Sequence, residues 1–203
     1  MKGLLLKDFY LCCSVLYLMV PVVAILGVAL SLLVSTWVLV VLSTVMFGMI
    51  AVSTINMDRV SGWQKVSAVL PLSRARVVDS KYTLYLLLSG AGFLLGLVVG
   101  GAVSGIQGAF DWATMGIYLA IGVDMALMAG SFTIPLSFLL GEEKNVLAVI
   151  LAYPIAAAAF VGIVVPLGGT ALACALAAAV GAVCYLLSWM LARKGLAARE
   201  VTG

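Results

Sequence analysis

The sequence predicts an all-α membrane protein with six transmembrane helices. Of its 203 residues, 65% are hydrophobic and only 9% are charged, whereas a soluble globular domain carries roughly 25% charged residues. So few charges do not cover a water-facing surface, and lipid is therefore the expected solvent for most of the chain. Apolar runs of about 20 residues, the length of a membrane-spanning helix, recur throughout. The alternating segments of about ten residues that are typical of a β-barrel are absent from the sequence.

Polar or turn-forming residues separate the predicted spans. The first span contains Pro21, which predicts a kink, and a long polar stretch, residues 56–81, separates the second span from the third. GEEKN at residues 141–145 and a tight turn at residues 166–170 separate the later ones. The predicted spans, within a single domain covering residues 1–203, are residues 11–32, 37–55, 82–103, 112–140, 146–165 and 171–191.

The third predicted span carries glycines at intervals of four residues, at Gly92, Gly96 and Gly100. Glycine on one helix face allows two helix backbones to approach closely in lipid. The spacing therefore predicts a close helix contact, either within this chain or with another one.

The basic residues indicate how the chain is oriented. With six spans, all eleven of them fall on the same side of the membrane, and that side is expected to be the cytoplasm. Both termini and residues 56–81 are therefore predicted to be cytoplasmic, while the opposite side offers only Asp111 and short turns. The basic residues are Lys2, Lys7, Arg59, Lys65, Arg74, Arg76, Lys81, Lys144, Arg193, Lys194 and Arg199.

Several kinds of catalysis are excluded by composition. The chain has no histidine, which removes Ser-His and Cys-His nucleophile pairs and histidine metal sites. No phosphate-binding loop of the GxxxxGK[ST] type is present, and the four cysteines lie in predicted spans without metal-ligand spacing. We therefore expect a chain that is not an enzyme and holds no cofactor or metal of its own.

Asp124 is the only acidic residue near the middle of a predicted span. It lies about 12 residues into the fourth span, roughly 18 Å along a helix. An ionisable group at that depth is costly and indicates function by default. Two interpretations stand: Asp124 lines a translocation path, or it is a protonated or hydrogen-bonded group that fixes helix packing.

We call residues 56–81 the coupling segment. A capping box at residues 61–64 (SGWQ) predicts one short helix that ends at Pro71, and Ser73 is expected to cap a second one leading into the third span. The segment holds five basic residues and Trp63. Two short surface helices of this composition favour docking to another protein, although anchoring to lipid headgroups accounts for the same residues.

Several of these residues resemble a known family. The opening MKGLLLKDFY, and then Asp58, Trp63, the run Leu70-Pro71-Leu72-Ser73-Arg74, Val77 and Ser80-Lys81-Tyr82, are similar in order and spacing to small bacterial ABC-2 type transporter permeases. Those that export antimicrobial or cytolytic peptides are the most similar group. No sharp motif lies beyond Tyr82, where only the layout matches.

The resemblance implies a permease subunit of an ATP-binding-cassette exporter in the bacterial cytoplasmic membrane, moving a hydrophobic or amphipathic peptide, lipid or drug outward. Its implied partners are two copies of a cytoplasmic ATPase, which hold the ATP and Mg, and a second permease copy or paralogue. The segment would be the coupling helix. Asp124 has no counterpart in the family pattern. The residues implied in ATPase docking are Asp58, Trp63, Val66, Leu70, Pro71, Ser73, Arg74, Arg76 and Lys81.

Two other functions fit the same layout. One is the substrate-binding membrane subunit of a vitamin uptake system, although the small outer turns offer no convincing outer pocket. The other is a membrane immunity or assembly protein that binds a peptide without transporting it. A separate ATPase as partner would distinguish the exporter from the immunity or assembly protein.

Overall fold

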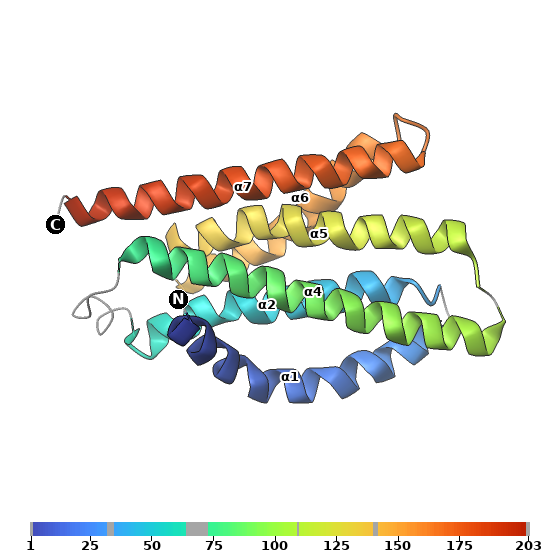
Figure 1. The fold of residues 1–203 in the computed structure, drawn as a ribbon, viewed down its shortest axis with the longest axis horizontal. Coiled ribbons are helices and arrows are strands. Elements are labelled where there is room, and N and C mark those ends of the chain that lie inside the picture. Colours follow the sequence, from blue (N-terminus) through green and yellow to red (C-terminus); the bar gives the residue numbers. More distant parts are fainter. Residues whose placement is uncertain (1, 32–34, 64–72, 109, 140–141, 202–203) are drawn as a thin grey trace.

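The computed structural model describes residues 2–31, 35–63, 73–108, 110–139 and 142–201. These residues form six α-helices and no strand, so the all-α prediction is confirmed (Figure 1). The described helices are α1 (Lys2–Ser31), α2 (Val38–Val60), α4 (Arg74–Gln107), α5 (Trp112–Leu139), α6 (Glu142–Val164) and α7 (Ala171–Val201).

Five of the described helices are long and apolar enough to cross a membrane. For α6, the described side chains begin at residue 149, and the apolar part among them, Val149–Val164, is by itself short for a membrane span. A multi-pass membrane protein is therefore shown, whereas the crossing predicted at residues 146–165 stays a prediction. The candidate span in α4 is the longest, at 33 residues (Ala75–Gln107), and its first turns carry Arg76, Asp79 and Lys81.

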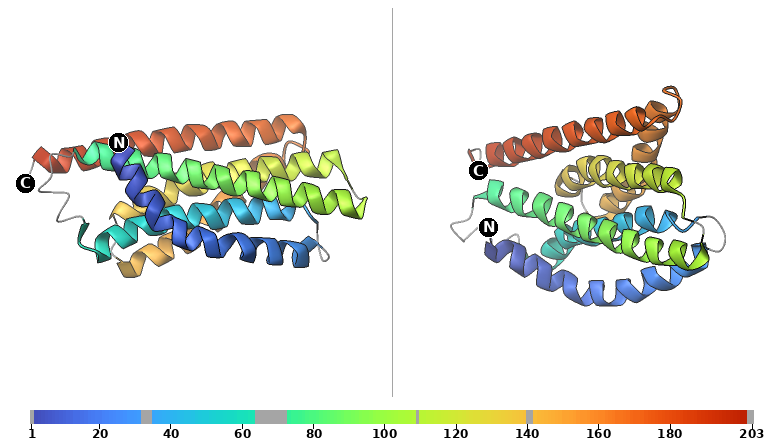
Figure 2. Two further views of the ribbon diagram at one scale, coloured as in Figure 1. Left: turned by 60° about the horizontal axis from the view of Figure 1, so that its bottom comes forward. Right: turned by 45° about the vertical axis from the view of Figure 1, so that its right-hand side comes forward.

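The helices form a bundle with α2, α4 and α5 at its centre. The α1 helix packs against α2 and α4 on one side, α7 packs against α5 and α4 on the other, and α6 lies behind α5 (Figures 1 and 2). In the most apolar window of α2, 61% of the residues are buried, compared with 11% for α1. The α1 helix therefore presents most of its apolar surface outward, as a helix in contact with lipid does.

The glycines of α4 make its contact with α2 close. A Cβ atom added to Gly92 would lie 2.5 Å from the carbonyl oxygen of Ser43, and one added to Gly96 would lie 2.6 Å from the Cα atom of Val40. Only glycine fits so near a neighbouring backbone. The predicted close contact is thus observed within the chain, between α4 and α2.

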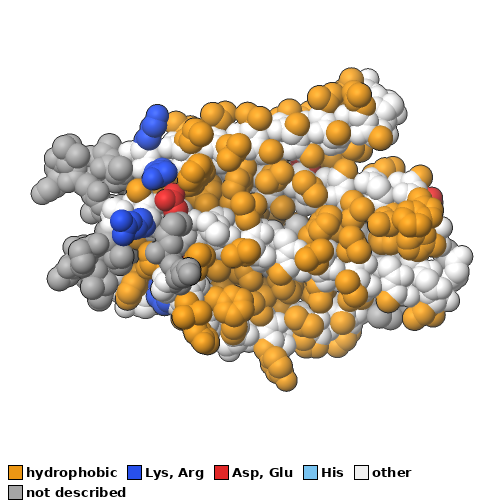
Figure 3. Space-filling model, viewed as in Figure 1, with side chains coloured by type: hydrophobic (Ala, Val, Ile, Leu, Met, Phe, Trp, Pro, Cys, Tyr) orange, Lys and Arg blue, Asp and Glu red, His pale blue; other side chains and the backbone are white. Residues whose placement is uncertain are grey.

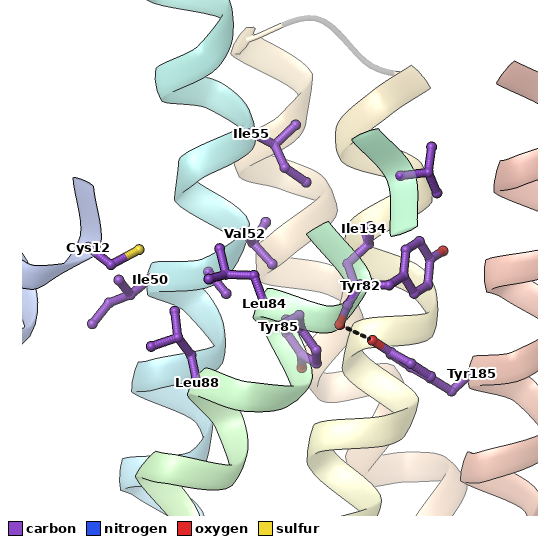
Figure 4. Close-up of a cluster of buried hydrophobic side chains, with 12 residues drawn as sticks. Cys12, Ile50, Val52, Ile55, Tyr82, Leu84, Tyr85, Leu88, Ile134 and Tyr185 are labelled. Atoms are coloured by element: carbon purple, nitrogen blue, oxygen red, sulfur yellow. Dashed lines mark hydrogen bonds between the residues drawn. The ribbon is translucent and has the colours of Figure 1, made fainter. Parts of the chain in front are cut away.

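The main hydrophobic core lies between α1, α2, α4, α5 and α7, and three of its buried side chains are tyrosines (Figure 4). The hydroxyl of Tyr185 donates a hydrogen bond to the carbonyl oxygen of Tyr82 at 2.9 Å. The Tyr185 ring stacks on Tyr85, with ring centroids 6.2 Å apart. Because buried tyrosine hydroxyls need partners, these contacts hold α4 and α7 in one register.

Both chain termini lie towards the same end of the bundle (Figure 1). The lysine and arginine side chains visible in Figure 3 gather at that end, while the long sides are covered by hydrophobic side chains. Basic residues at one end of the bundle are what the sequence predicted, and the prediction of a cytoplasmic side rests on them.

Residues 61–63 show how α2 ends. Ser61 is its C-cap, and its backbone N–H bonds the carbonyl oxygen of Met57 at 3.0 Å. Gly62 then takes a left-handed conformation with φ of 71°, which glycine adopts without steric strain. On the far side of the coupling segment, Ser73 lies at the N-cap of α4 without a side-chain capping bond. The first short helix predicted in this segment falls mainly on residues 64–72, outside the described residues. The second, predicted from Arg74 to Lys81, is helical and forms the first turns of α4.

Candidate functional site

Four charged side chains meet where α1, α2 and α4 converge. Lys7 and Asp8 come from α1, Asp58 from α2 and Lys81 from α4. The Lys81 ammonium lies 2.8 Å from Asp8 and 2.6 Å from Asp58, and the Lys7 ammonium lies 2.5 Å from Asp58 and 3.2 Å from Asp8. Each carboxylate contacts both ammonium groups, so the charges alternate around a closed ring. We call these four residues the charge cluster.

Three of the four residues of the charge cluster are buried, and Lys7 is partly exposed. Asp8, Asp58 and Lys81 are 1%, 6% and 4% exposed, and Lys81 also donates a hydrogen bond to the Thr54 hydroxyl at 3.0 Å. A buried charge is tolerated when it is both paired and hydrogen-bonded. The Lys7–Asp8 contact is the weakest side of the ring, because the nearer Asp8 oxygen has no hydrogen bond although the ion-pair distance is met.

Trp63, just beyond the end of α2, contacts the charge cluster. The Lys7 ammonium lies 4.4 Å from the centroid of the Trp63 ring, within the range of a cation–π interaction. Trp63 is only partly exposed, and it follows Gly62 directly. The turn at residues 61–63, which follows α2, is therefore attached to α1.

The neighbouring residue Arg59 attaches α2 to α5. Its guanidinium donates hydrogen bonds to the carbonyl oxygens of Ser137 and Phe138, at 2.6 and 3.1 Å. These carbonyls belong to the last turn of α5, where helical carbonyls lack intrahelical donors and a cation is favoured by the helix dipole. The C-terminal ends of α2 and α5 are thus held together.

A third group of contacts attaches α7 to α4. The Trp189 indole N–H donates to the Asp79 carboxylate at 2.8 Å, and the Arg193 guanidinium lies 3.9 Å from the same carboxylate. One turn deeper, the Tyr82 and Ser188 hydroxyls are 2.8 Å apart. All five long helices are therefore connected at the end of the bundle from which the coupling segment emerges.

The structure brings together only part of the predicted docking set. Asp58, Trp63 and Lys81 lie in or on the charge cluster, where their polar groups face other helices of this chain. Ser73 and Arg76 are exposed at the start of α4, and Arg74 is the first residue of that helix. Val66, Leu70 and Pro71 lie outside the described residues. Contact of any of these residues with an ATPase stays a prediction.

Asp124 lies away from the charge cluster. It belongs to α5 and is fully buried, and neither carboxylate oxygen has a hydrogen-bond partner among the described residues. The interpretation that a hydroxyl hydrogen bond holds Asp124 in place is therefore not supported there. A role in a translocation path stays a prediction.

Lys7 and Asp8 were not predicted from the sequence as members of a site. They are 50 to 74 positions from Asp58 and Lys81 along the chain, and no local pattern pairs residues at such separations. One signal was available: two acidic and two basic residues occupy the same end of three apolar helices. Charges placed in lipid-facing helices are expected to find each other.

Comparison with known proteins gives the family. A sequence profile described as "ABC-2 family transporter protein" matches residues 3–196, and this range includes all four residues of the charge cluster and most of each described helix. No match was found among curated proteins or among solved structures. The family consists of generally non-catalytic membrane components that typically work with an ABC ATPase. The chain therefore belongs to the ABC-2 family of transporter membrane proteins.

Proposed function

We propose that this chain is the permease subunit of an ATP-driven exporter in the bacterial cytoplasmic membrane. It moves a hydrophobic or amphipathic substrate outward, and two copies of a separate cytoplasmic ATPase supply the energy and hold the ATP and Mg. A second permease, identical or paralogous, completes the transporter. The ATPase acts on the coupling segment.

The observation that carries this proposal is the charge cluster at the base of the coupling segment. Separating a buried ion pair leaves uncompensated charge in a medium of low dielectric constant, which is strongly unfavourable. The ends of α1, α2 and α4 that the cluster joins therefore move as one unit. A force applied to residues 61–73 reaches α2 and α4 through the backbone, and α1 through Lys7.

An exposed basic residue at the start of α4 supplies a docking position for an acidic partner. Arg76 is exposed two residues into α4, and cationic and anionic patches on two partners steer and orient their association. In this proposal Arg76, with Arg74, meets acidic residues of the ATPase. Asp58 and Lys81 act indirectly, by fixing the positions of the helices that carry the segment.

The docking claim is tested by charge reversal. Arg76→Glu is expected to reduce co-purification of the ATPase, because it places a carboxylate against an acidic surface. Lys194→Glu is the matched control, since Lys194 is also an exposed basic residue but lies in α7, outside the coupling segment. Equal retention of the ATPase by Arg76→Glu and wild type would refute docking at this position. An equal loss in both variants would indicate a non-specific charge effect.

Force transmission is tested separately from docking. The double variant Lys7→Met/Asp58→Asn removes one lysine and one aspartate and leaves Asp8 paired with Lys81, so the remaining charges still cancel. We expect it to bind the ATPase normally and to lose most substrate transport, because α1 no longer follows the segment. Wild-type transport by this variant would show that the charge cluster does not transmit the motion.

A further inference from the structure

The carboxylate of Asp124 has no partner that the described part of the chain supplies. The side chain is 0% exposed and both of its oxygens lack hydrogen bonds. It lies close to α7 at Gly181, where an added Cβ atom would lie 3.3 Å from Oδ1. A buried ionised carboxylate without a partner is among the most costly groups in a membrane interior. When Asp124 is ionised, its complement is therefore a cation from outside the described chain.

An apolar groove lies between the same two helices that enclose this carboxylate, and Asp124 itself does not line it. It has a volume of about 610 Å³ and lies between the N-terminal halves of α5 and α7, with Ala120 and Val123 on one side and Ala175 and Ala178 on the other. Trp112 and Gly169 line the groove at its outer end, where α5 begins and α7 follows a turn. A site of this volume falls in the range of small-molecule pockets.

Helical spacing places Asp124 at the inner end of the groove. Ala120 lies four positions before Asp124 on α5, and Ala178 lies three positions before Gly181 on α7. Residues three or four apart share a helix face. The two rows that line the groove thus continue to Asp124 and Gly181, whose close contact ends it.

We propose that the groove and Asp124 together form a binding site for an amphipathic monocation. An apolar chain occupies the groove, and a protonated amine or quaternary ammonium pairs with the Asp124 carboxylate. Charge complementarity selects this ligand, because the groove is apolar along its length and a single unpaired acid stands at its end. Small residues on both helices leave room for an alkyl chain.

Binding requires α5 and α7 to part by a small distance at Gly181. Glycine has no side chain to interlock with α5, so only the backbone of α7 has to move there. Binding itself does not depend on an ATPase. The further step, that such a cation is the exported substrate, rests on the proposed function.

The test uses the purified chain alone, reconstituted in nanodiscs of zwitterionic lipid. Saturable binding of radiolabelled dodecyltrimethylammonium is measured by scintillation proximity, with dodecylamine and dodecanol as competitors. We expect Asp124→Asn to weaken binding at least about tenfold, the effect of losing one charge-assisted contact. Dodecylamine should compete, whereas dodecanol, with the same chain and no charge, should compete at least about tenfold more weakly.

Two further variants make the result decisive. Ala178→Phe fills the groove, leaves the Asp124 carboxylate in place, and should weaken binding at least as much as Asp124→Asn. Asp111→Asn removes an exposed acid beside Trp112 at the groove mouth and should leave binding unchanged. Wild-type binding by Asp124→Asn, or equal competition by dodecanol, would overturn the proposal, as would a loss in Asp111→Asn as large as in Asp124→Asn. These outcomes leave ATPase docking untouched, so the two proposals fail separately.

Discussion

Lys81 is the most constrained member of the charge cluster. Its ammonium contacts both aspartates within 2.8 Å and also bonds the Thr54 hydroxyl, and the residue is 4% exposed. A lysine normally extends its ammonium to water when a path is available. Here the ammonium stays inside the bundle because two carboxylates and a hydroxyl replace the water.

Replacing Lys81 should therefore destabilise the bundle strongly. Lys81→Met keeps the apolar stem but leaves two aspartates sharing one lysine. We expect a loss of about 3–5 kcal/mol in the free energy of unfolding, the usual effect of breaking a buried pair. Circular dichroism during denaturant titration in detergent measures it.

The control adds Asp58→Asn to the same variant. The pair Lys81→Met/Asp58→Asn leaves Lys7 and Asp8 as one neutral pair, so it should recover much of the lost stability. If the single variant unfolds at the same denaturant concentration as wild type, the cluster is not a stabilising unit.

Asp111 illustrates the opposite, exposed situation at the start of α5. Its carboxylate accepts hydrogen bonds from the Thr114 hydroxyl and from the backbone N–H groups of Ala113 and Thr114. The Thr114 hydroxyl, followed by the Ala113 N–H, holds the pKa of Asp111 below its ordinary value of 3.8. Since the folded pKa is depressed, ionised Asp111 stabilises the cap above pH 3.8, and this contribution is lost as the pH falls through the folded value.

We therefore predict a difference in acid sensitivity between wild type and Asp111→Asn. The stability of wild type should fall more steeply below about pH 4, because only wild type loses an ionised cap. Thermal unfolding followed at pH 3 to 6 measures the difference between the two proteins. Parallel curves would show that the cap does not depend on ionisation.

The contact between α2 and α4 depends on glycine along one face. Gly96 approaches the carbonyl oxygen of Leu39 so closely that an added Cβ atom would lie 2.7 Å away. Gly101, five residues further along the same helix, has nothing within 4 Å of its Cβ position. The same substitution at these two sites thus separates packing from helix propensity.

Gly96→Ala is expected to destabilise the bundle by about 1–3 kcal/mol, as overpacking does. Gly101→Ala should be neutral or slightly stabilising, because alanine favours helix and meets open space there. Both are measured by denaturant titration on the same preparation. A similar stability in the two variants would show that α2 and α4 are not in close contact at Gly96.

The orientation of the bundle is open to direct measurement. The gathering of basic residues at one end predicts that this end is cytoplasmic. In intact cells, an impermeant maleimide should label a cysteine introduced at Asp111 and leave one at Lys194 unlabelled until the membrane is permeabilised. The wild-type chain, with four free cysteines, is the background control. Labelling in the reverse order would invert the assignment.

The helices were predictable from the sequence because a helix that crosses lipid has to be apolar over about 20 residues. The apolar runs therefore give both the presence and the approximate length of a helix. The ends of the helices were less predictable. The third span was predicted at residues 82–103, whereas α4 runs from Arg74 to Gln107, since its polar first turns bind other helices of the bundle. The position of Asp124 was predictable from counting residues alone. The charge cluster was not, because pairing Lys7 with Asp58 requires knowing that α1 crosses the ends of α2 and α4.

The length of α4 brings the bilayer itself into the behaviour of this bundle. Its 34 residues, Arg74–Gln107, make a helix about 51 Å long at 1.5 Å per residue, whereas the hydrocarbon core is about 30 Å thick. A helix with such an excess tilts, or extends beyond the hydrocarbon. The first turns of α4, which include Lys81, belong to the coupling segment. The tilt of α4 therefore sets how far that segment stands above the membrane. In the proposed transporter, a change in acyl-chain length is therefore expected to shift the segment on which the ATPase would act.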